Sequence, residues 1–461
     1  MTRPGVEQQS GEAVTIECLV PGGAGMARRD DGSILFVPGA YPQDVVEVHD
    51  VTRKGGTAFA GRMRVLAPSP QRVAAPCAFF ETCGGCDLMA IDGDAQKKAK
   101  LDLVQQALRR TGGLHWPDLR WHASPDALHY RERIRLHVKQ GQLGFFSRAS
   151  HVLVPVTECL VARPELNDAL SRLLTLARDQ RGVFSHFEAI DVRVVSHPGH
   201  GQAARLLVHL LPRPKTQRKN QRPGQRPRAQ GQAQHDPETR RAAGSIASAL
   251  PASSVVRLAG DESPPVQDHV AQGSFIYSRP GLFSQVNAAV NQLMIEHVIQ
   301  VAQQAAARTF LDLYCGSGNF SVPLMARGLD GVGVEFEPEA VDLARRAAVE
   351  QSAPGFGQGQ FIAADSQDFA SQELMQKSYD LVIVDPPRAG AKQILEAVVR
   401  ATRSTLVMVS CDPVTLARDL KQLMQHGLAV QTISCFDMFP HTHHVETIAV
   451  LHNPPRAGRS S

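Results

Sequence analysis

The sequence predicts a multidomain protein: a small N-terminal β-barrel, a central α+β domain and a C-terminal α/β domain with a doubly wound sheet. Short strands broken by turns fill the N-terminal part, and strands alternate with helices from residue 281 onward. Between these parts, residues 212–237 contain no large apolar residue and are typical of a disordered insert. A chain of 461 residues has room for several domains. We place their boundaries at residues 10–72, 73–280 and 281–455.

The overall composition excludes several classes of protein. There are 49 Lys and Arg residues against 45 Asp and Glu, and a net charge of +4 is too small to indicate a nucleic-acid binder by itself. No apolar run reaches the roughly 18 residues that a membrane span requires. Residues 1–14 are polar and do not resemble a secretory leader. We therefore expect a cytoplasmic protein that does not contact a membrane.

The N-terminal region predicts a barrel. From about Thr15 to Leu66 the pattern gives five short strands, among them Thr15–Val20 and Ser33–Val37, separated by turns rich in Gly and Pro. Strands of this length and spacing are typical of the oligonucleotide-binding (OB) type of barrel. A small barrel without a ligand is the alternative.

The central region mixes helix and strand. Residues 95–110 have the apolar periodicity of a helix. Residues 131–138 alternate as a strand does, so that Arg131, Arg133 and Arg135 share one face. These arginines could contact nucleic-acid phosphates, or they could belong to an ordinary solvated sheet face.

The C-terminal region predicts a parallel sheet with helices on both faces, because its strands and helices alternate. The last two strands have no helix between them, which predicts an antiparallel edge. Seven strands with this ending fit the Rossmann-like class I methyltransferase sheet better than a six-stranded dinucleotide-binding sheet. The expected strands are Thr309–Tyr314, Gly331–Glu335, Gln360–Ala364, Tyr379–Val384, Thr405–Ser410, Val430–Phe436 and Val445–Leu451, and the expected helices are Asn287–Ala307, Pro338–Glu350, Ala391–Arg403 and Val414–Gln425.

The first strand of this sheet leads into a glycine-containing loop, Leu311–Phe320. Glycines let a nucleotide approach the backbone closely, and an acidic residue about 20 positions later can accept the ribose hydroxyls. Glu335 has that position, and Asp365 ends the third strand. The features together favour S-adenosylmethionine over NAD, although each acid alone could be an ordinary strand-end cap. No phosphate-cradling Gly-x-x-x-x-Gly-Lys-Ser/Thr loop is present in the sequence.

Three further groups lie where strands of the sheet meet the ligand crevice. Asp385-Pro386-Pro387 ends the fourth strand and Cys411 follows the fifth, and ligands of open α/β sheets bind outside these carboxyl ends. Cys411 precedes a helix, whose N-terminus would favour the thiolate. Glu446 opens the last strand. A lone cysteine is more often a small buried hydrophobe, which is the alternative for Cys411.

A thiolate and a carboxylate beside a methyl donor match methylation of a pyrimidine at carbon 5. Carbon 5 is a poor nucleophile until Cys411 adds to carbon 6, and a base such as Glu446 must then remove the carbon 5 proton. Two alternatives remain: methylation of an amine through Asp385, which needs no cysteine, and an RNA-binding factor without catalysis.

Four cysteines suggest a metal site. Cys77, Cys83 and Cys86 form a cluster, with Cys159 farther along the chain. In a cytoplasmic protein such a cluster favours metal or iron–sulfur binding over disulfides. Spacing alone leaves both a zinc ion and a [4Fe–4S] cluster open.

Long motifs resemble those of the RNA uracil-5-methyltransferases, over nearly the whole chain apart from the insert and the ends. They are Phe283–Asn287, Asp437–Thr442 with Glu446, and the N-terminal Gly23–Ala27 and Phe36–Ala40, which look like a TRAM domain. The resemblance implies that the four cysteines hold a [4Fe–4S] cluster, with Cys411 as nucleophile and Glu446 as base. It also implies that S-adenosylmethionine is bound by Gln285, Tyr314, Asn319, Glu335, Asp365 and Asp385.

The resemblance also narrows the choice of RNA substrate. A TRAM domain together with four cysteines is typical of the branch that methylates 23S ribosomal RNA, whereas the transfer-RNA branch lacks both. We therefore expect 23S ribosomal RNA as the substrate and a monomeric enzyme. A transfer-RNA or dual-specificity enzyme is the alternative.

Overall fold

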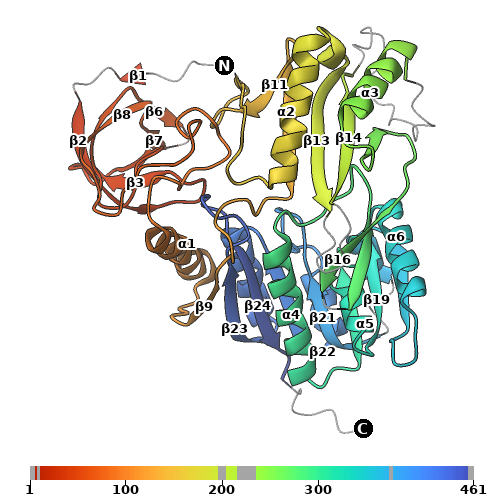
Figure 1. Ribbon diagram of the computed structural model, residues 1–461. Helices are drawn as coiled ribbons and strands as arrows, with labels where there is room; N and C mark the ends of the chain where they lie inside the picture. Colours follow the sequence, from red (N-terminus) through yellow and green to blue (C-terminus); the bar gives the residue numbers. More distant parts are fainter. Residues whose placement is uncertain are drawn as a thin grey trace, which may run out of the picture.

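The computed structural model describes residues 6–7, 11–54, 56–195, 204–214, 235–271, 273–372 and 377–454. In this part of the chain the strands form an eight-stranded N-terminal sheet, a six-stranded central sheet, a two-stranded hairpin and an eight-stranded C-terminal sheet. Figure 1 shows the N-terminal and central parts beside each other, with the C-terminal part below them. No described helix is both long and apolar enough to cross a membrane.

The N-terminal sheet has the strand order β1-β6-β7-β4-β3-β2-β5-β8 and encloses a core that includes Val14, Ile16, Val46 and Val48. It has eight strands where the sequence predicted five, because strands of two to four residues show too little alternation to be recognised. Its strands are β1 (Val6–Glu7), β2 (Glu12–Leu19), β3 (Gly25–Arg28), β4 (Ile34–Val37), β5 (Val45–His49), β6 (Val51–Lys54), β7 (Thr57–Phe59) and β8 (Arg62–Ala67).

The central sheet has the order β12-β11-β10-β13-β14-β15. Alternation in β10 buries Ile134, Leu136 and Val138, as its pattern predicts. Most of the predicted insert, residues 215–234, lies outside the described residues. The elements are β10 (Arg133–Lys139), β11 (Gln142–Phe146), β12 (Leu153–Val154), α2 (Pro164–Asp179), β13 (Phe187–Val195), β14 (Arg205–Pro212), α3 (Pro237–Ala249) and β15 (Val255–Leu258), followed by the hairpin β16 (Val266–Ala271) and β17 (Ser274–Ser278).

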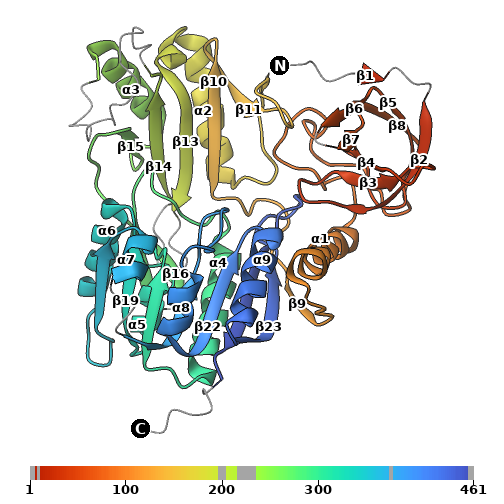
Figure 2. The ribbon, with the colours of Figure 1, turned by 180° about the vertical axis from the view of Figure 1, so that it is seen from behind.

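The C-terminal sheet has the order β20-β19-β18-β21-β22-β24-β23-β9, with β24 antiparallel to its neighbours. Helices α4, α5 and α6 pack on one face, and α7, α8 and α9 on the other (Figures 1 and 2). The elements are α4 (Ala288–Gln304), β18 (Thr309–Leu313), α5 (Ser321–Met325), β19 (Asp330–Glu335), α6 (Pro338–Glu350), β20 (Gly359–Ala363), α7 (Ser366–Gln372), β21 (Tyr379–Val384), α8 (Leu395–Ala401), β22 (Thr402–Ser410), α9 (Pro413–Gln425), β23 (Ala429–Phe436) and β24 (Glu446–His452).

All seven strands predicted for this sheet are present, but the expected number is wrong by one. The eighth strand, β9 (Leu119–His122), comes from the segment after α1 (Gly93–Ala107) and pairs in parallel with β23. Helix α1 joins the same region, since Val104 and Ala107 belong to the core on the α9 side. One helix is also shorter than predicted: α8 ends at Ala401, because the next residues already belong to β22.

Strand order reverses at β18, which lies between β19 and β21. In an open α/β sheet this switch point creates a crevice outside the carboxyl ends of the strands. The loops after β18, β21 and β22 all begin at that edge of the sheet. The fold therefore brings the motifs predicted to be functional to one place.

Candidate active site

A pocket lies at the switch point. Four residues predicted to bind the methyl donor line it together: Gln285, Tyr314, Asn319 and Asp385. The loop after β18 turns sharply at this point, because Tyr314 has φ 65°, in the left-handed region that few non-glycine residues adopt. A strained backbone of this kind occurs often where a ligand is held.

Glu335 and Asp365, the other two residues predicted to bind the donor, do not line this pocket, but each accepts a backbone hydrogen bond. Glu335 Oε2 accepts a hydrogen bond from the Gly316 backbone N–H (3.0 Å), which fixes the glycine loop against the end of β19. Asp365 Oδ1 accepts one from the Gln367 N–H (2.8 Å) at the start of α7. Both carboxylates keep lone pairs for a ligand, so strand-end capping and donor binding are compatible roles.

Asn319 is fixed by a partner that the sequence did not reveal. Its amide and that of Asn291 in α4 exchange two hydrogen bonds of 2.9 Å each. The pair joins the donor loop to the helix that follows the Gln285 motif. Asn291 lies one helical turn after Asn287. In the sequence, this spacing was the only indication that Asn291 faces the donor loop.

Buried carboxyl groups gather around the crevice. Burial raises the pKa of Asp312 to about 7 and that of Asp385 to about 7. Burial, reinforced by the charge of Asp385, raises the pKa of Glu446 to about 8, and Arg388 opposes the shift. Carboxyl groups with such pKa values hold or release a proton near neutral pH, as acid–base catalysts must.

Cys411 lies on the same rim. It lines a small pocket with Arg388, Asp412, His443 and His444. We expected the start of α9 to favour the thiolate, but this expectation is wrong for the free protein. Burial, followed by the charge of Glu446, raises the pKa of the Cys411 thiol to about 11, and Arg388 lowers it only in part.

The residue after Cys411 begins the helix. Asp412 Oδ1 accepts a hydrogen bond from the Thr415 backbone N–H (2.7 Å), which makes it the N-cap of α9. Asn and Asp are equally good N-caps. Asp412 therefore stabilises the local structure that presents Cys411.

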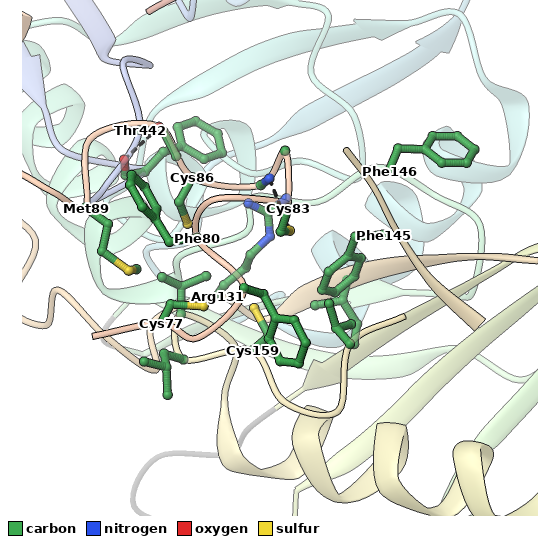
Figure 3. A pocket seen from close by; sticks show the side chains of 18 of the residues that line it. Cys77, Phe80, Cys83, Cys86, Met89, Arg131, Phe145, Phe146, Cys159 and Thr442 are labelled. Carbon is green, nitrogen blue, oxygen red and sulfur yellow. Dashed lines mark hydrogen bonds between the residues drawn. The ribbon is translucent and has the colours of Figure 1, made fainter. Parts of the chain in front are cut away.

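The four cysteines predicted to bind metal surround a single cavity of about 390 Å³ (Figure 3). Phe145, Phe146, Arg131 and the active-site residue His444 also line it. Among the described residues, only His186, Asp236 and Glu238 form a group of three or more metal-type ligands whose atoms lie within 4.8 Å of one another. No three of the four thiols lie within 4.8 Å of one another, whereas a single zinc ion holds its sulfurs about 3.8 Å apart.

Two of the three arginines predicted to share one face of the central strand pair with a single aspartate. Arg133 donates to Asp191 Oδ2 (2.9 Å), and Arg135 donates to both carboxylate oxygens of the same residue (2.6 and 2.7 Å). Arg131 Nε donates to the Arg133 backbone oxygen (2.9 Å), and Arg131 and Arg135 both line the cavity of the cysteines. Asp191 offsets one of the three positive charges, so binding of RNA phosphates by this face stays a prediction.

Sequence reasoning missed Arg388 as a functional residue. Its positive charge opposes the rise in pKa of both Cys411 and Glu446. Arg388 also lines both the cysteine cavity and the small pocket of Cys411. Its position directly after Asp385-Pro386-Pro387 was the available signal.

Comparison with known proteins agrees with this geometry. A family model described as tRNA (Uracil-5-)-methyltransferase matches residues 262–453. The 23S rRNA (uracil(1939)-C(5))-methyltransferase RlmD of Shewanella sp. (strain MR-7) is 31% identical over 93% of each chain. The chain belongs to the RNA uracil-5-methyltransferase family. RlmD of Vibrio parahaemolyticus is similarly related, at 32% identity over 95% of each chain.

The family also accounts for the fold. The crystal structure of Pyrococcus abyssi tRNA (uracil-54, C5)-methyltransferase in complex with S-adenosyl-L-homocysteine superposes with a TM-score of 0.68 and 22% identity. The match covers 97% of this chain and 100% of that one. The C-terminal part is thus a class I methyltransferase domain that follows an N-terminal β-sheet domain. The protein is an RNA uracil-C5 methyltransferase that uses S-adenosylmethionine.

Proposed function

We propose that this protein methylates carbon 5 of a uridine in 23S ribosomal RNA, at the position equivalent to uridine 1939, as a cytoplasmic monomer. One observation carries the chemistry: Cys411 lies close enough to Glu446 for the carboxylate charge to raise the pKa of the thiol, and Asp385, whose charge raises the pKa of both groups, lines the donor pocket with Gln285. An enzyme that methylates amines needs no nucleophile at that point. The sequence identity of 31–32% to RlmD proteins, which extends over 93–95% of the chain, supports the choice of RNA.

In the proposed mechanism the Cys411 thiol gives up its proton to solvent and attacks carbon 6 of the uracil as the thiolate. Arg388 favours the thiolate at this stage. The resulting enolate takes the methyl group that S-adenosylmethionine supplies. Glu446 then removes the proton from carbon 5, the Cys411–carbon 6 bond breaks, and the product is released. The uridine must be unstacked to enter, since neighbouring bases otherwise cover the face of the ring that Cys411 attacks.

The choice of RNA is tested by mapping the methylated base. Total RNA from a strain that lacks the gene is incubated with the protein and labelled methyl donor, and the product is located by mass mapping of 23S and transfer RNA. We expect a single 5-methyluridine in 23S RNA. Label in transfer RNA alone would contradict the proposed substrate while leaving the chemistry intact.

We also propose that residues 10–72, 73–280 and 281–455 are a TRAM domain of the OB type, a central domain with a [4Fe–4S] site, and the catalytic domain. Two observations support the cluster. Cys77, Cys83, Cys86 and Cys159 line one cavity with wider spacing than a single ion requires. Burial raises the pKa of Cys83, Cys86 and Cys159, and the nearby Arg131 guanidinium opposes the rise in each, which suits a group with net negative charge.

Iron content tests this assignment. Protein purified without oxygen is expected to contain about four iron and four sulfide per chain. Cys86→Ser should lower both, whereas Cys18→Ser, at a half-buried thiol of the barrel, should not. Stoichiometric zinc without sulfide would identify a zinc site instead.

A further inference from the structure

A buried lysine from a distant part of the chain fixes the loop that connects β23 to Glu446. Lys100, in α1, donates from Nζ to Asp437 Oδ1 (2.5 Å) and to the Phe439 backbone oxygen (2.9 Å). Asp437 directly follows β23, and Glu446 begins β24. Lys100 therefore fixes the first half of the connection that ends at Glu446. We call this connection, residues 437–445, the base loop.

A second side chain of α1 holds the middle of the base loop. Gln96 Oε1 accepts from the His441 backbone N–H (3.0 Å), while its Nε2 donates to the Ile91 backbone oxygen (2.9 Å). Gln96 and Lys100 lie four residues apart and so share one face of the helix. His441 has φ 65°, a conformation that needs support from its surroundings.

The burial of Lys100 argues for a specific role. Its side chain is 0% exposed and that of Asp437 is 18% exposed. Lysine is almost never fully buried unless it is paired, because removing the ammonium from water is costly. A leucine would serve packing alone. Both hydrogen-bond acceptors of the ammonium in the described part of the chain lie in the base loop, so the loop is what the charge organises.

The far end of the base loop is fixed by another part of the molecule. Asp87 Oδ1 accepts from the His443 backbone N–H (2.8 Å), and its other oxygen pairs with the His443 ring. Tyr41 of the barrel donates to the Asp87 backbone oxygen (2.8 Å). With this end held independently, loss of the α1 contacts would shift the loop without releasing it.

We propose that Lys100 is a positioning residue of the methylation reaction. Acting through the base loop, it aims the Glu446 carboxylate at the carbon 5 proton of the covalent intermediate. The inference rests on the proposed role of Glu446 as the base. It predicts a defect in the proton-removal step and not in RNA binding or in the addition of Cys411.

Lys100→Met tests this, because methionine keeps the length of the side chain and removes the charge. Lys98→Met is the matched control, at an exposed lysine two residues away that pairs with Asp102. Turnover and the fraction of enzyme covalently bound to RNA on denaturing gels are measured for both. We expect about a tenfold or greater loss of kcat for Lys100→Met with KM for RNA nearly unchanged, and more covalent RNA. Lys98→Met should match the unmodified enzyme.

Two further variants make the outcome decisive. Gln96→Met removes neutral hydrogen bonds only, so it tests the same step if Lys100→Met does not fold. Glu446→Gln shows what blocked proton removal looks like. If Glu446→Gln accumulates covalent RNA while neither α1 variant does, the positioning role is wrong and the proposed function stands. If Glu446→Gln accumulates none, the proposed role of Glu446 as base fails, and the inference about Lys100 fails with it.

Discussion

Replacing Cys411 with alanine is expected to abolish methyl transfer, by about a thousandfold or more, while donor binding persists. The donor pocket is lined by Gln285, Tyr314, Asn319 and Asp385, whereas Cys411 lines the neighbouring pocket. The uracil ring would therefore meet a complete donor site but would not become nucleophilic at carbon 5. Labelled methyl transfer to RNA and calorimetric titration of the donor measure the two properties separately.

Cys18→Ala is the control for this experiment, since Cys18 is a half-buried thiol in the N-terminal sheet. It should retain full activity. Turnover by Cys411→Ala would exclude the covalent mechanism and would favour methylation of an amine through Asp385. Loss of donor binding would instead mean that the substitution had disturbed the sheet.

Replacing Glu446 with glutamine is expected to stop the reaction after methyl transfer. The Cys411–carbon 6 bond would form and the methyl group would move, but the carbon 5 proton would stay. Enzyme and RNA should then migrate together on a denaturing gel, with the label in the band. Glu350→Gln, at an exposed carboxylate of α6 far from the rim, is the matched control and should release its product.

The same step should depend on pH in a defined direction. Burial raises the pKa of Glu446 to about 8, so its carboxylate, the form that accepts a proton, becomes more abundant as pH rises through that value. Breakdown of the covalent intermediate in the unmodified enzyme should therefore accelerate between pH 7 and pH 9. A rate that falls over this range would contradict the assignment of Glu446 as base.

Much of this site was accessible from the sequence because its parts follow a regular rule. Glu335 is the last residue of its parallel strand, and Asp385 and Cys411 each directly follow theirs; such residues meet at one edge of the sheet. The strands before Asp385 and Cys411 were recognisable because they are buried on both faces over most of their length and are therefore rich in apolar residues. The order of strands then placed these side chains together without any knowledge of side-chain contacts.

What escaped prediction depends on long-range contacts and burial. The Lys100–Asp437 pair joins residues 337 positions apart, and nothing in the helix pattern of residues 95–110 marks one lysine as buried. The raised pKa of Cys411 has the same origin, because it depends on burial and on Glu446, which the sequence places 35 residues away. A motif shows which groups are available, but their protonation depends on the packed surroundings.

Strand β9 makes the catalytic sheet dependent on the first third of the chain. It covers the side of β23 that would otherwise be a free edge, and unpaired edges invite association with other chains. Residues 119–122 leave the ribosome long before β23 exists, so this part of the protein must wait for its partner during synthesis. A fragment cut at residue 281 would lack both β9 and α1. Cys411 and Glu446 would then belong to a sheet with an exposed edge strand. The smallest stable catalytic unit is therefore larger than the α/β domain.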